Sequence, residues 1–317
     1  TTKLLSGTII DSHITTDTTW TSSGNPYYVT IDLVVINDVT LTVNEGVNVL
    51  IDEDKYIKIK VSINVTGTQN SVVNFTSNNS VTGDDWNGIK LDLEEEDYAH
   101  FSWTNISYAY MGINIQGDGY YGQITIRNST FIRGNEGETY GIYGYTGDDT
   151  LVFDSKFYGF YTAIERADYE IYNSEFINNT YGVGGTNGNG VERTSIYYSN
   201  FVNNTYAVKG RSDGGHFYGN TITGSDIAVY EHSGNWGHAA CNSLHNNTLA
   251  VKFKGGSQGW IYNNFLDNEY NVNHTNDDDY SIANNYWGNL TESEIADTIY
   301  DFYDNSDRGI LTFTPIL

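Results

Sequence analysis

The sequence predicts an all-β solenoid, a single-stranded right-handed parallel β-helix in which similar coils stack on one another. A phrase recurs along the chain: residues 171–183 read IYNSEFINNTYGV, and residues 196–208 read IYYSNFVNNTYAV. Weaker copies share the closing apolar residue, which falls at Ile113, Ile142, Ile164, Val183, Val208, Val229, Val251 and Val272. The steps are therefore 29, 22, 19, 25, 21, 22 and 21 residues. A recurrence of this size indicates stacked repeats rather than a globular domain of mixed elements.

The pattern inside each copy predicts short strands. Apolar and polar residues alternate over short runs, which is typical of a strand with one buried face. Clusters of Asn, Gly, Ser and Asp interrupt these runs every four to six residues, as turns would. A leucine-rich repeat would need regularly spaced Leu and a helical segment, and a propeller blade would need about twice the length.

Stacking of the coils predicts ladders of equivalent residues. One apolar ladder should contain Val183, Val208, Val229, Val251 and Val272, and a second should contain Phe176, Phe201, Ile222, Leu244, Phe265 and Tyr286. The Asn residues at turn positions should adopt left-handed backbone and bond to the Asn of the next coil; these are Asn173, Asn263 and Asn284. Cys241 aligns with Tyr172, Tyr197, Tyr218 and Tyr262 and is expected to be packed or partly buried.

The ends of the chain differ from the repeats. Residues 1–35 lack the phrase and are expected to form an N-terminal arm and cap strands, whereas residues 36–288 form the β-helix. Residues 289–317 are expected to be a C-terminal cap with a helix of about ten residues. That helix is indicated by apolar residues at helical spacing from Leu290 to Phe302 and by the capping-box pattern of Thr291 and Glu294. A last strand over 309–315 should follow.

The composition narrows the possible partners and the compartment. The chain of 317 residues has 15 Lys and Arg against 40 Asp and Glu, a formal charge of −25, which disfavours nucleic acid and anionic lipid as partners. No apolar run reaches the ~18 residues of a membrane span, so membrane insertion is not expected. The absence of an initial Met and of a signal peptide suggests a processed or trimmed chain. We expect an extracellular or cell-surface protein.

N-glycosylation sequons support that location. They begin at Asn64, Asn74, Asn78, Asn105, Asn128, Asn178, Asn203, Asn246, Asn273 and Asn289. Each is predicted as a candidate attachment site.

The motifs at the two ends of the chain carry a family resemblance. The stretches are the Trp20…Pro26-Tyr27-Tyr28 opening, residues 72–77 (VVNFTS) followed by Trp86-Asn-Gly-Ile89, residues 284–288 (NNYWG) and residues 309–315 (GILTFTP). Together they resemble right-handed parallel β-helix repeat proteins exported by archaea and bacteria, within the pectate-lyase-like superfold. The resemblance implies architecture more than activity, because that broad group includes surface-layer and adhesion modules, copper-site accessory proteins and carbohydrate enzymes.

No catalytic set emerges from the acidic residues. The nearest constellation is Asp148-Asp149 with Glu165-Arg166, but the carboxylate clusters lie in predicted loops without the basic partners that lyases or hydrolases need. We therefore expect no enzyme activity, no catalytic residue and no cofactor. The loop 277–279 could hold Ca²⁺, but a solvated acidic turn is the preferred interpretation. His216 and His238, 22 residues apart, could lie together on one face, but solvent-facing turn residues are the preferred interpretation.

Three functions remain open. The first is a self-assembling cell-surface or filament subunit whose N-terminal arm, through Leu4, Leu5, Ile9 and Ile10, adds to the sheet edge of another copy. The alternative is a glycan-binding adhesin module that uses exposed aromatic residues, with Tyr120, Tyr121, Tyr143, Tyr145, Trp236 and Trp260 as candidates. A polysaccharide lyase or glycoside hydrolase is the second alternative.

Overall fold

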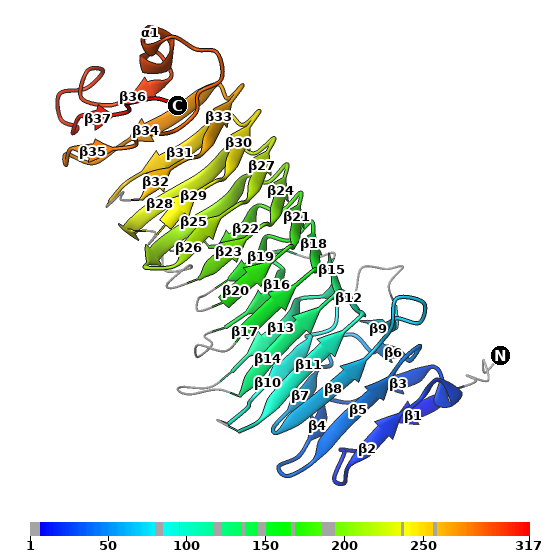
Figure 1. Ribbon diagram of the computed structural model, residues 1–317. Helices are drawn as coiled ribbons and strands as arrows, with labels where there is room; N and C mark the ends of the chain where they lie inside the picture. Colours follow the sequence, from blue (N-terminus) through cyan, green and yellow to red (C-terminus); the bar gives the residue numbers. More distant parts are fainter. Residues whose placement is uncertain are drawn as a thin grey trace. The chain divides into compact units, whose positions relative to one another are not determined.

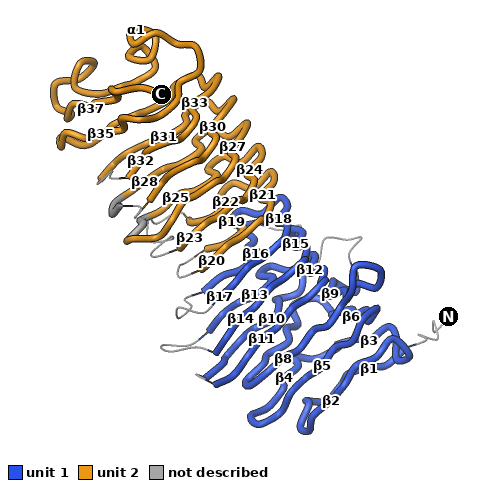
Figure 2. The backbone as a smooth tube through the Cα atoms, viewed as in Figure 1, with its two compact units in different colours: residues 1–161 blue, residues 162–317 orange. Residues whose placement is uncertain are grey.

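The protein forms two compact units, residues 1–161 and residues 162–317 (Figure 2). A computed structural model describes residues 7–79, 85–94, 96–116, 122–134, 137–144, 150–165, 169–185, 194–235, 238–255 and 259–317. The boundary between the units, at residues 161 and 162, lies within the β-helix segment predicted over 36–288.

The fold is the predicted right-handed parallel β-helix, and it is nearly all β (Figure 1). The chain passes through three sheets in turn, which we call A, B and C. Most strands therefore pair with the strand three places along, whereas β1 pairs with β3 and β34 with β36. All strand pairings recorded within these sheets are parallel, because each coil repeats the path of the coil before it. Inward side chains of neighbouring coils therefore superpose in both units.

Unit 1 holds the first coils. Its part of sheet A contains β1 (Thr8–Ile10), β3 (Tyr27–Val29), β6 (Asn48–Ile51), β9 (Val73–Ser77), β12 (Thr104–Ala109), β15 (Thr130–Arg133) and β18 (Lys156–Tyr158). Its part of sheet B contains β4 (Leu33–Val35), β7 (Ile57–Ile59), β10 (Ile89–Leu91), β13 (Met111–Ile115) and β16 (Tyr140–Tyr143). Its part of sheet C contains β2 (Thr18–Trp20), β5 (Thr40–Asn44), β8 (Ser62–Thr66), β11 (Tyr98–Ser102), β14 (Gln123–Arg127) and β17 (Thr150–Phe153). A short 3-10 helix covers Ser22–Gly24.

Unit 2 holds the later coils and the C-terminal segment. Its part of sheet A contains β21 (Glu175–Ile177), β24 (Asn200–Val202), β27 (Thr221–Thr223), β30 (Ser243–His245) and β33 (Asn264–Leu266). Its part of sheet B contains β19 (Thr162–Glu165), β22 (Tyr181–Gly184), β25 (Tyr206–Asp213), β28 (Ile227–Asn235), β31 (Leu249–Phe253), β34 (Tyr270–His274) and β36 (Ile299–Tyr300). Its part of sheet C contains β20 (Tyr169–Tyr172), β23 (Ser195–Tyr197), β26 (His216–Tyr218), β29 (His238–Ala240) and β32 (Trp260–Ile261). The C-terminal segment adds α1 (Glu292–Ala296) and the strand pair β35 (Tyr280–Ser281) with β37 (Leu311–Thr312).

The predicted apolar ladders form the core. The closing Val residues pair in register from Val183 to Val272 through β22, β25, β28, β31 and β34, and all are buried. Full burial of one such side chain contributes about 1.5–3 kcal/mol. The second ladder runs as predicted from Phe176 to Phe265. Its predicted last member is wrong, because Trp287 rather than Tyr286 stacks on Phe265, with ring centroids 4.6 Å apart.

The asparagines at the turns have two different structural roles, which the sequence pattern does not distinguish. Asn173 and Asn284 adopt the predicted left-handed backbone, with φ of 48° and 59°, but Asn263 does not. Asn263 instead belongs to a buried ladder in which each side-chain oxygen accepts from the backbone N–H of the preceding coil. The ladder contains Asn220, Asn242, Asn263 and Asn285.

Cys241 lies one position away from its predicted alignment with Tyr218. Ala240, not Cys241, pairs with Tyr218, and Cys241 takes the left-handed position that Tyr198 and Tyr262 occupy in other coils. The expectation of a packed thiol is wrong, because this position points away from the core and Cys241 is exposed.

The two ends also differ in detail from expectation. The strand β1 is not an unpaired arm, because it pairs with β3 in parallel register, Thr8 opposite Tyr27 and Ile10 opposite Val29. The C-terminal helix α1 has 5 residues rather than about ten, and it carries the predicted capping box of Thr291 and Glu294. The early end of α1 follows from Thr298, which begins the chain's return to sheet B by accepting from the backbone N–H of Asn271.

Candidate functional site

Two columns of side chains on sheet B of unit 2 form the candidate site, which we call the B face. In one column, the register places Lys209 beside Tyr230, then Lys252, Asn273 and Tyr300 on successive strands. The other column contains Tyr181, Tyr206, Ile227, Leu249 and Tyr270.

The local sequence explains why the side chains of the first column share one face. Each member of the first column from Lys209 to Asn273 directly follows the closing Val of its copy, as Lys209 follows Val208 and Lys252 follows Val251. Successive residues of a strand point to opposite faces of the sheet, so a buried Val directs the next side chain outward. The coil register then stacks these outward residues at the strand spacing of about 4.8 Å.

The B face brings cations and phenol rings together. The Lys209 Nζ atom lies 4.9 Å from the ring centroid of Tyr181, 4.8 Å from that of Tyr206 and 5.7 Å from that of Tyr230. The Lys252 Nζ atom lies 4.9 Å from the Tyr230 centroid. Partial burial, and then the charge of Lys252, lower the pKa of Lys209 below its usual range. The two lysines therefore repel one another, and an anion bound between them would relieve that repulsion.

Within the described residues, the cations at the B face have no carboxylate partner. Among the described residues, the recorded ion pair joins Lys58 and Asp92, at 2.8 Å, in unit 1. Within the same part of the chain, Lys209, Lys252 and Arg308 form no ion pair. These positive charges belong to a chain with a formal charge of −25, so the B face is locally opposite in charge to the protein as a whole.

Two tyrosines of the B face, Tyr181 and Tyr206, cover part of each other's ring faces. Tyr181 and Tyr206 stack on each other, with centroids 5.1 Å apart and an interplanar angle of 13°. Burial, and then Tyr206, raise the pKa of Tyr230, so its phenol stays protonated. In the described part of the chain, the hydroxyls of Tyr206 and Tyr230 have no hydrogen-bond partner. The face therefore offers hydroxyl and ammonium donors to a ligand.

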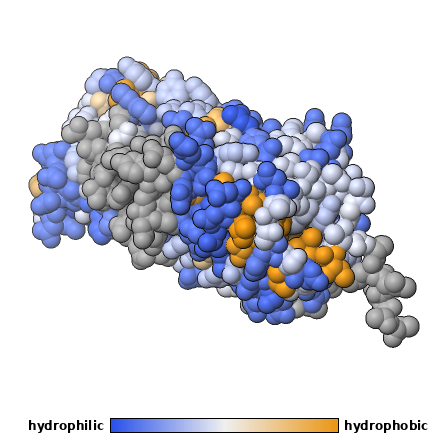
Figure 3. All heavy atoms as spheres, turned by 90° about the horizontal axis from the view of Figure 1, so that it is seen from below, coloured by the Kyte–Doolittle hydropathy of each residue, from blue (hydrophilic) through white to orange (hydrophobic). Residues whose placement is uncertain are grey.

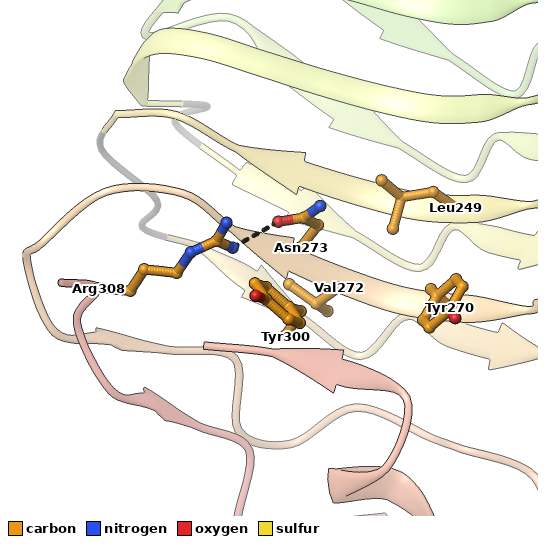
Figure 4. A pocket seen from close by; sticks show the side chains of 6 residues that line it. All are labelled: Leu249, Tyr270, Val272, Asn273, Tyr300 and Arg308. Atoms are coloured by element: carbon orange, nitrogen blue, oxygen red, sulfur yellow. Dashed lines mark hydrogen bonds between the residues drawn. The ribbon is translucent and has the colours of Figure 1, made fainter. Parts of the chain in front are cut away.

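A pocket of about 360 Å³ lies at the C-terminal end of the B face (Figure 4). Leu249 and Val272 provide its apolar lining, Tyr270 and Tyr300 its aromatic side chains, and Asn273 and Arg308 its polar groups. Arg308 comes from the irregular chain before β37 and reaches Asn273, to which its Nη1 atom donates at 2.8 Å. This volume falls within the range of small-ligand pockets.

A second concave surface lies on sheet C of unit 2. It has a volume of about 270 Å³ and is lined by Tyr197, His216, Tyr218, His238 and Ala240. His216 and His238 do lie together, because their rings stack with centroids 5.6 Å apart and 8° between planes. The preferred interpretation of these histidines as turn residues is wrong, because they lie in the strands β26 and β29. The nitrogen lone pairs of parallel imidazoles lie in the ring planes, so in this arrangement they do not converge on one ion.

On the face of the molecule shown in Figure 3, most of the coloured surface is hydrophilic, and hydrophobic side chains gather in a limited area. Of the aromatic candidates, Tyr120, Tyr121, Tyr145 and Trp236 lie outside the described residues. Tyr143 is half-buried beside Tyr140. The expectation for Trp260 is wrong: it is only 1% exposed, and its Nε1 atom donates to the buried Glu231 at 3.2 Å.

The candidate acidic sites fall into two groups. Asp148, Asp149 and Arg166 lie outside the described residues. In the loop 277–279, Asp279 accepts from the backbone N–H of Ile310 at 2.7 Å, and the backbone carbonyl of Asp278 contacts His274 Nε2 at 2.8 Å. Within the described ranges, no three His, Cys, Asp or Glu side chains gather as a metal site would need.

The structure distinguishes the sequons by environment. Asn74 and Asn105 bond to one another in a side-chain ladder of sheet A. Asn273 accepts from Arg308. Asn64 lies half-buried in β8, and Asn128 is half-buried at a left-handed turn. The exposed ones are Asn78, Asn178, Asn203, Asn246 and Asn289.

Of the assembly candidates, Leu4 and Leu5 lie outside the described residues. Ile9 is 57% exposed and Ile10 is half-buried, and both belong to β1, the first strand of sheet A.

Comparisons of the chain with protein-family models, curated proteins and solved structures gave no match. None of the helices in the described ranges has the length and apolar character needed to cross a membrane.

Proposed function

We propose that this protein is a non-catalytic, extracellular β-helix that binds an extended polysaccharide along the B face. The observation that carries the proposal is the column of Lys209, Tyr230 and Lys252, which offers donor groups without a carboxylate partner in the described part of the chain. Polysaccharides present closely spaced hydroxyl and, in some cases, carboxylate acceptors, which suit such donors.

The repetition of the site supports a long ligand rather than a small one. Equivalent outward positions recur at about 4.8 Å from one strand to the next. A linear polymer lying along the column would meet a donor on each coil from β25 to β31, and weak contacts would add along the chain. Nucleic acid is a poorer candidate, because its dense phosphates would meet a chain with 40 acidic residues.

The test is titration calorimetry with a panel of soluble neutral, uronate-containing and sulfated polysaccharides. The double variant Lys209→Ala/Lys252→Ala should bind at least about tenfold more weakly than the wild type, a loss of about 1.4 kcal/mol. The matched control is Lys55→Ala/Lys60→Ala, which removes the same charge from unit 1. Equal losses in both variants, or no binding by the wild type to any polymer, would contradict the proposal.

A second candidate function is self-assembly through β1. Its support is that β1 has one partner strand, β3, and stands first in sheet A, with Ile9 exposed. Backbone groups on the open side of an edge strand can pair with a strand of another copy.

That candidate predicts concentration-dependent oligomers in light scattering or filaments in negative-stain micrographs. Ile9→Lys should abolish them, because charge on an edge strand opposes pairing. The control is Ile132→Lys, since Ile132 is also exposed but lies on β15, which has a partner strand on each side. A wild-type protein that stays monomeric at high concentration would contradict self-assembly through β1.

The proposed extracellular location has separate support. Asn178, Asn203 and Asn246 are exposed at turns of unit 2 that follow strands of sheet A, where an attached glycan would not disturb the core. Intact-mass analysis of the natural protein should therefore show N-linked glycan. Unmodified peptides for all exposed sequons would remove this support.

A further inference from the structure

The guanidinium of Arg308, in the pocket at the end of the B face, is held by several contacts. Its Nη1 atom donates to Asn273 Oδ1 at 2.8 Å and to the backbone carbonyl of His274 at 2.6 Å. Its Cζ atom lies 4.2 Å from the ring centroid of Tyr300. Two hydrogen bonds and a ring contact thus fix the orientation of a half-buried cation at the pocket.

Part of this guanidinium remains available to a ligand. Within the described residues, its Nε and Nη2 atoms donate to no protein acceptor. The nearby buried carboxylate of Asp301 is already engaged, because it accepts from the backbone N–H groups of Tyr303 and Leu311 at 3.0 and 2.9 Å. Adjacent Nε and Nη2 donors form the edge that pairs with a carboxylate through two parallel hydrogen bonds.

The other lining residues indicate what should carry the carboxylate. Leu249 and Val272 give an apolar surface, and Tyr270 and Tyr300 add aromatic walls, which suit the C–H faces of a sugar ring. The first column of the B face joins this pocket directly, since Lys252 pairs with Asn273 and Asn273 pairs with Tyr300. A polymer lying on the B face would therefore place one of its residues in the pocket.

We propose that the pocket is a subsite for a uronic acid residue, whose carboxylate pairs with Arg308 and whose ring packs against Tyr270 and Tyr300. This inference rests on the proposed polysaccharide-binding function and names the class of polysaccharide as acidic. Lys252, one strand away, would meet the carboxylate of a neighbouring residue.

The experiment compares a uronate oligosaccharide with the same oligosaccharide after chemical reduction of its carboxylates to primary alcohols. The two probes have the same backbone and differ in charge. Calorimetry with the wild-type protein should show at least tenfold tighter binding of the uronate form. Equal binding of the two forms would overturn the inference and leave the proposed function intact, whereas binding of neither would overturn both.

Two substitutions of Arg308 distinguish a role in binding the carboxylate from a role in folding. Arg308→Gln should lower uronate affinity to that of the reduced form and leave the affinity of the reduced form unchanged. Arg308→Lys keeps the charge but loses the paired donors, so it should recover at most a small part of the preference.

Equal loss of both affinities in Arg308→Gln would mean that Arg308 only supports the fold of this segment, and would overturn the assignment. The thermal unfolding midpoint, measured on the same samples, shows whether the variants remain folded. Equally tight, Arg308-dependent binding of a sulfated neutral oligosaccharide would overturn the choice of carboxylate.

Discussion

At the residue scale, buried asparagines hold neighbouring coils of unit 2 together. The side chain of Asn242 donates to the Phe217 carbonyl at 2.8 Å and to Asn263 Oδ1 at 2.9 Å, and it accepts from the backbone N–H of Asn220 at 2.9 Å. Each bond satisfies a polar group that the coil turn would otherwise leave buried without a partner. Such groups are costly when unpaired, so the ladder specifies the register of the coils.

The asparagine ladder gives a stability prediction. Asn242→Ala should lower the free energy of unfolding by about 3 kcal/mol, because it leaves several buried groups unsatisfied at a cost of about 1–3 kcal/mol each. Chemical denaturation monitored by circular dichroism measures the change. Asn264→Ala is the control, since Asn264 is exposed and should change stability by less than about 0.5 kcal/mol. Comparable losses in the two variants would contradict the role of the ladder.

A second residue-scale prediction concerns His274, which is buried and contacts the Asp278 carbonyl through Nε2. Burial is the main cause that lowers its pKa below the ordinary 6.5. A His with a depressed pKa binds protons in the unfolded state first, so stability is full above about pH 6.5 and falls as the pH drops below it.

Thermal unfolding measured between pH 8 and pH 5 tests this statement. His274→Gln can keep a donor toward Asp278 but cannot be protonated, so it should flatten the decline of stability below pH 6.5. The difference between the two proteins isolates His274 from His100 and His232, whose pKa values are also lowered. Identical pH profiles for variant and wild type would refute the assignment.

At the scale of the elements, the sheet A ladder provides much of the core. Phe176 and Phe201 stack with centroids 4.7 Å apart, and both are fully buried. Phe201→Ala should destabilise the protein by about 3–5 kcal/mol, because it removes the ring and leaves a cavity between two coils. Val202→Ala, on the outward side of the same strand, should cost much less, and denaturation curves compare the two. A loss below about 1 kcal/mol for Phe201→Ala would contradict this packing.

The strands of sheet B in unit 2 show how much of the fold the sequence predicts. The period and the closing Val positions were sufficient to place β22, β25, β28, β31 and β34 in one sheet, because identical coils must superpose their inward residues. The one-residue errors at Tyr286 and Cys241 arose at turns, where alternation breaks and the sequence pattern does not report which residue takes the left-handed position.

The B face was not predicted from the sequence, although three of its residues share one position of the repeat. The residues that follow the closing Val, Lys209, Tyr230 and Lys252, could have been found by aligning the copies at that position. Arg308 could not, because it stands 35 residues from Asn273 in irregular chain, and no repeat position predicts their contact.

At the scale of the whole molecule, the negative charge and the B face act in opposite directions on an acidic polymer. Forty acidic residues repel it over long distances, whereas Lys209, Lys252 and Arg308 attract it at contact. The screening length falls from about 30 Å at 0.01 M salt to about 8 Å at 0.15 M, so moderate salt removes the repulsion first. Affinity for a uronate polysaccharide should therefore rise between these concentrations and fall toward 1 M.

Calorimetry across that salt series measures the effect, with the carboxyl-reduced polymer as a control that should show little change. If the affinity for the uronate form instead falls steadily from the lowest salt concentration, long-range repulsion by the acidic residues does not oppose binding.

Hydroxyl-radical footprinting can show whether polysaccharide covers the B face. Tyr206 and Tyr230 report on the B face, and Tyr172 and Tyr197, half-buried and stacked on sheet C, serve as internal controls. With saturating polysaccharide, oxidation of Tyr206 and Tyr230 should fall several-fold while that of Tyr172 and Tyr197 stays constant. Protection confined to Tyr172 and Tyr197, or no protection under conditions in which calorimetry shows binding, would contradict the account.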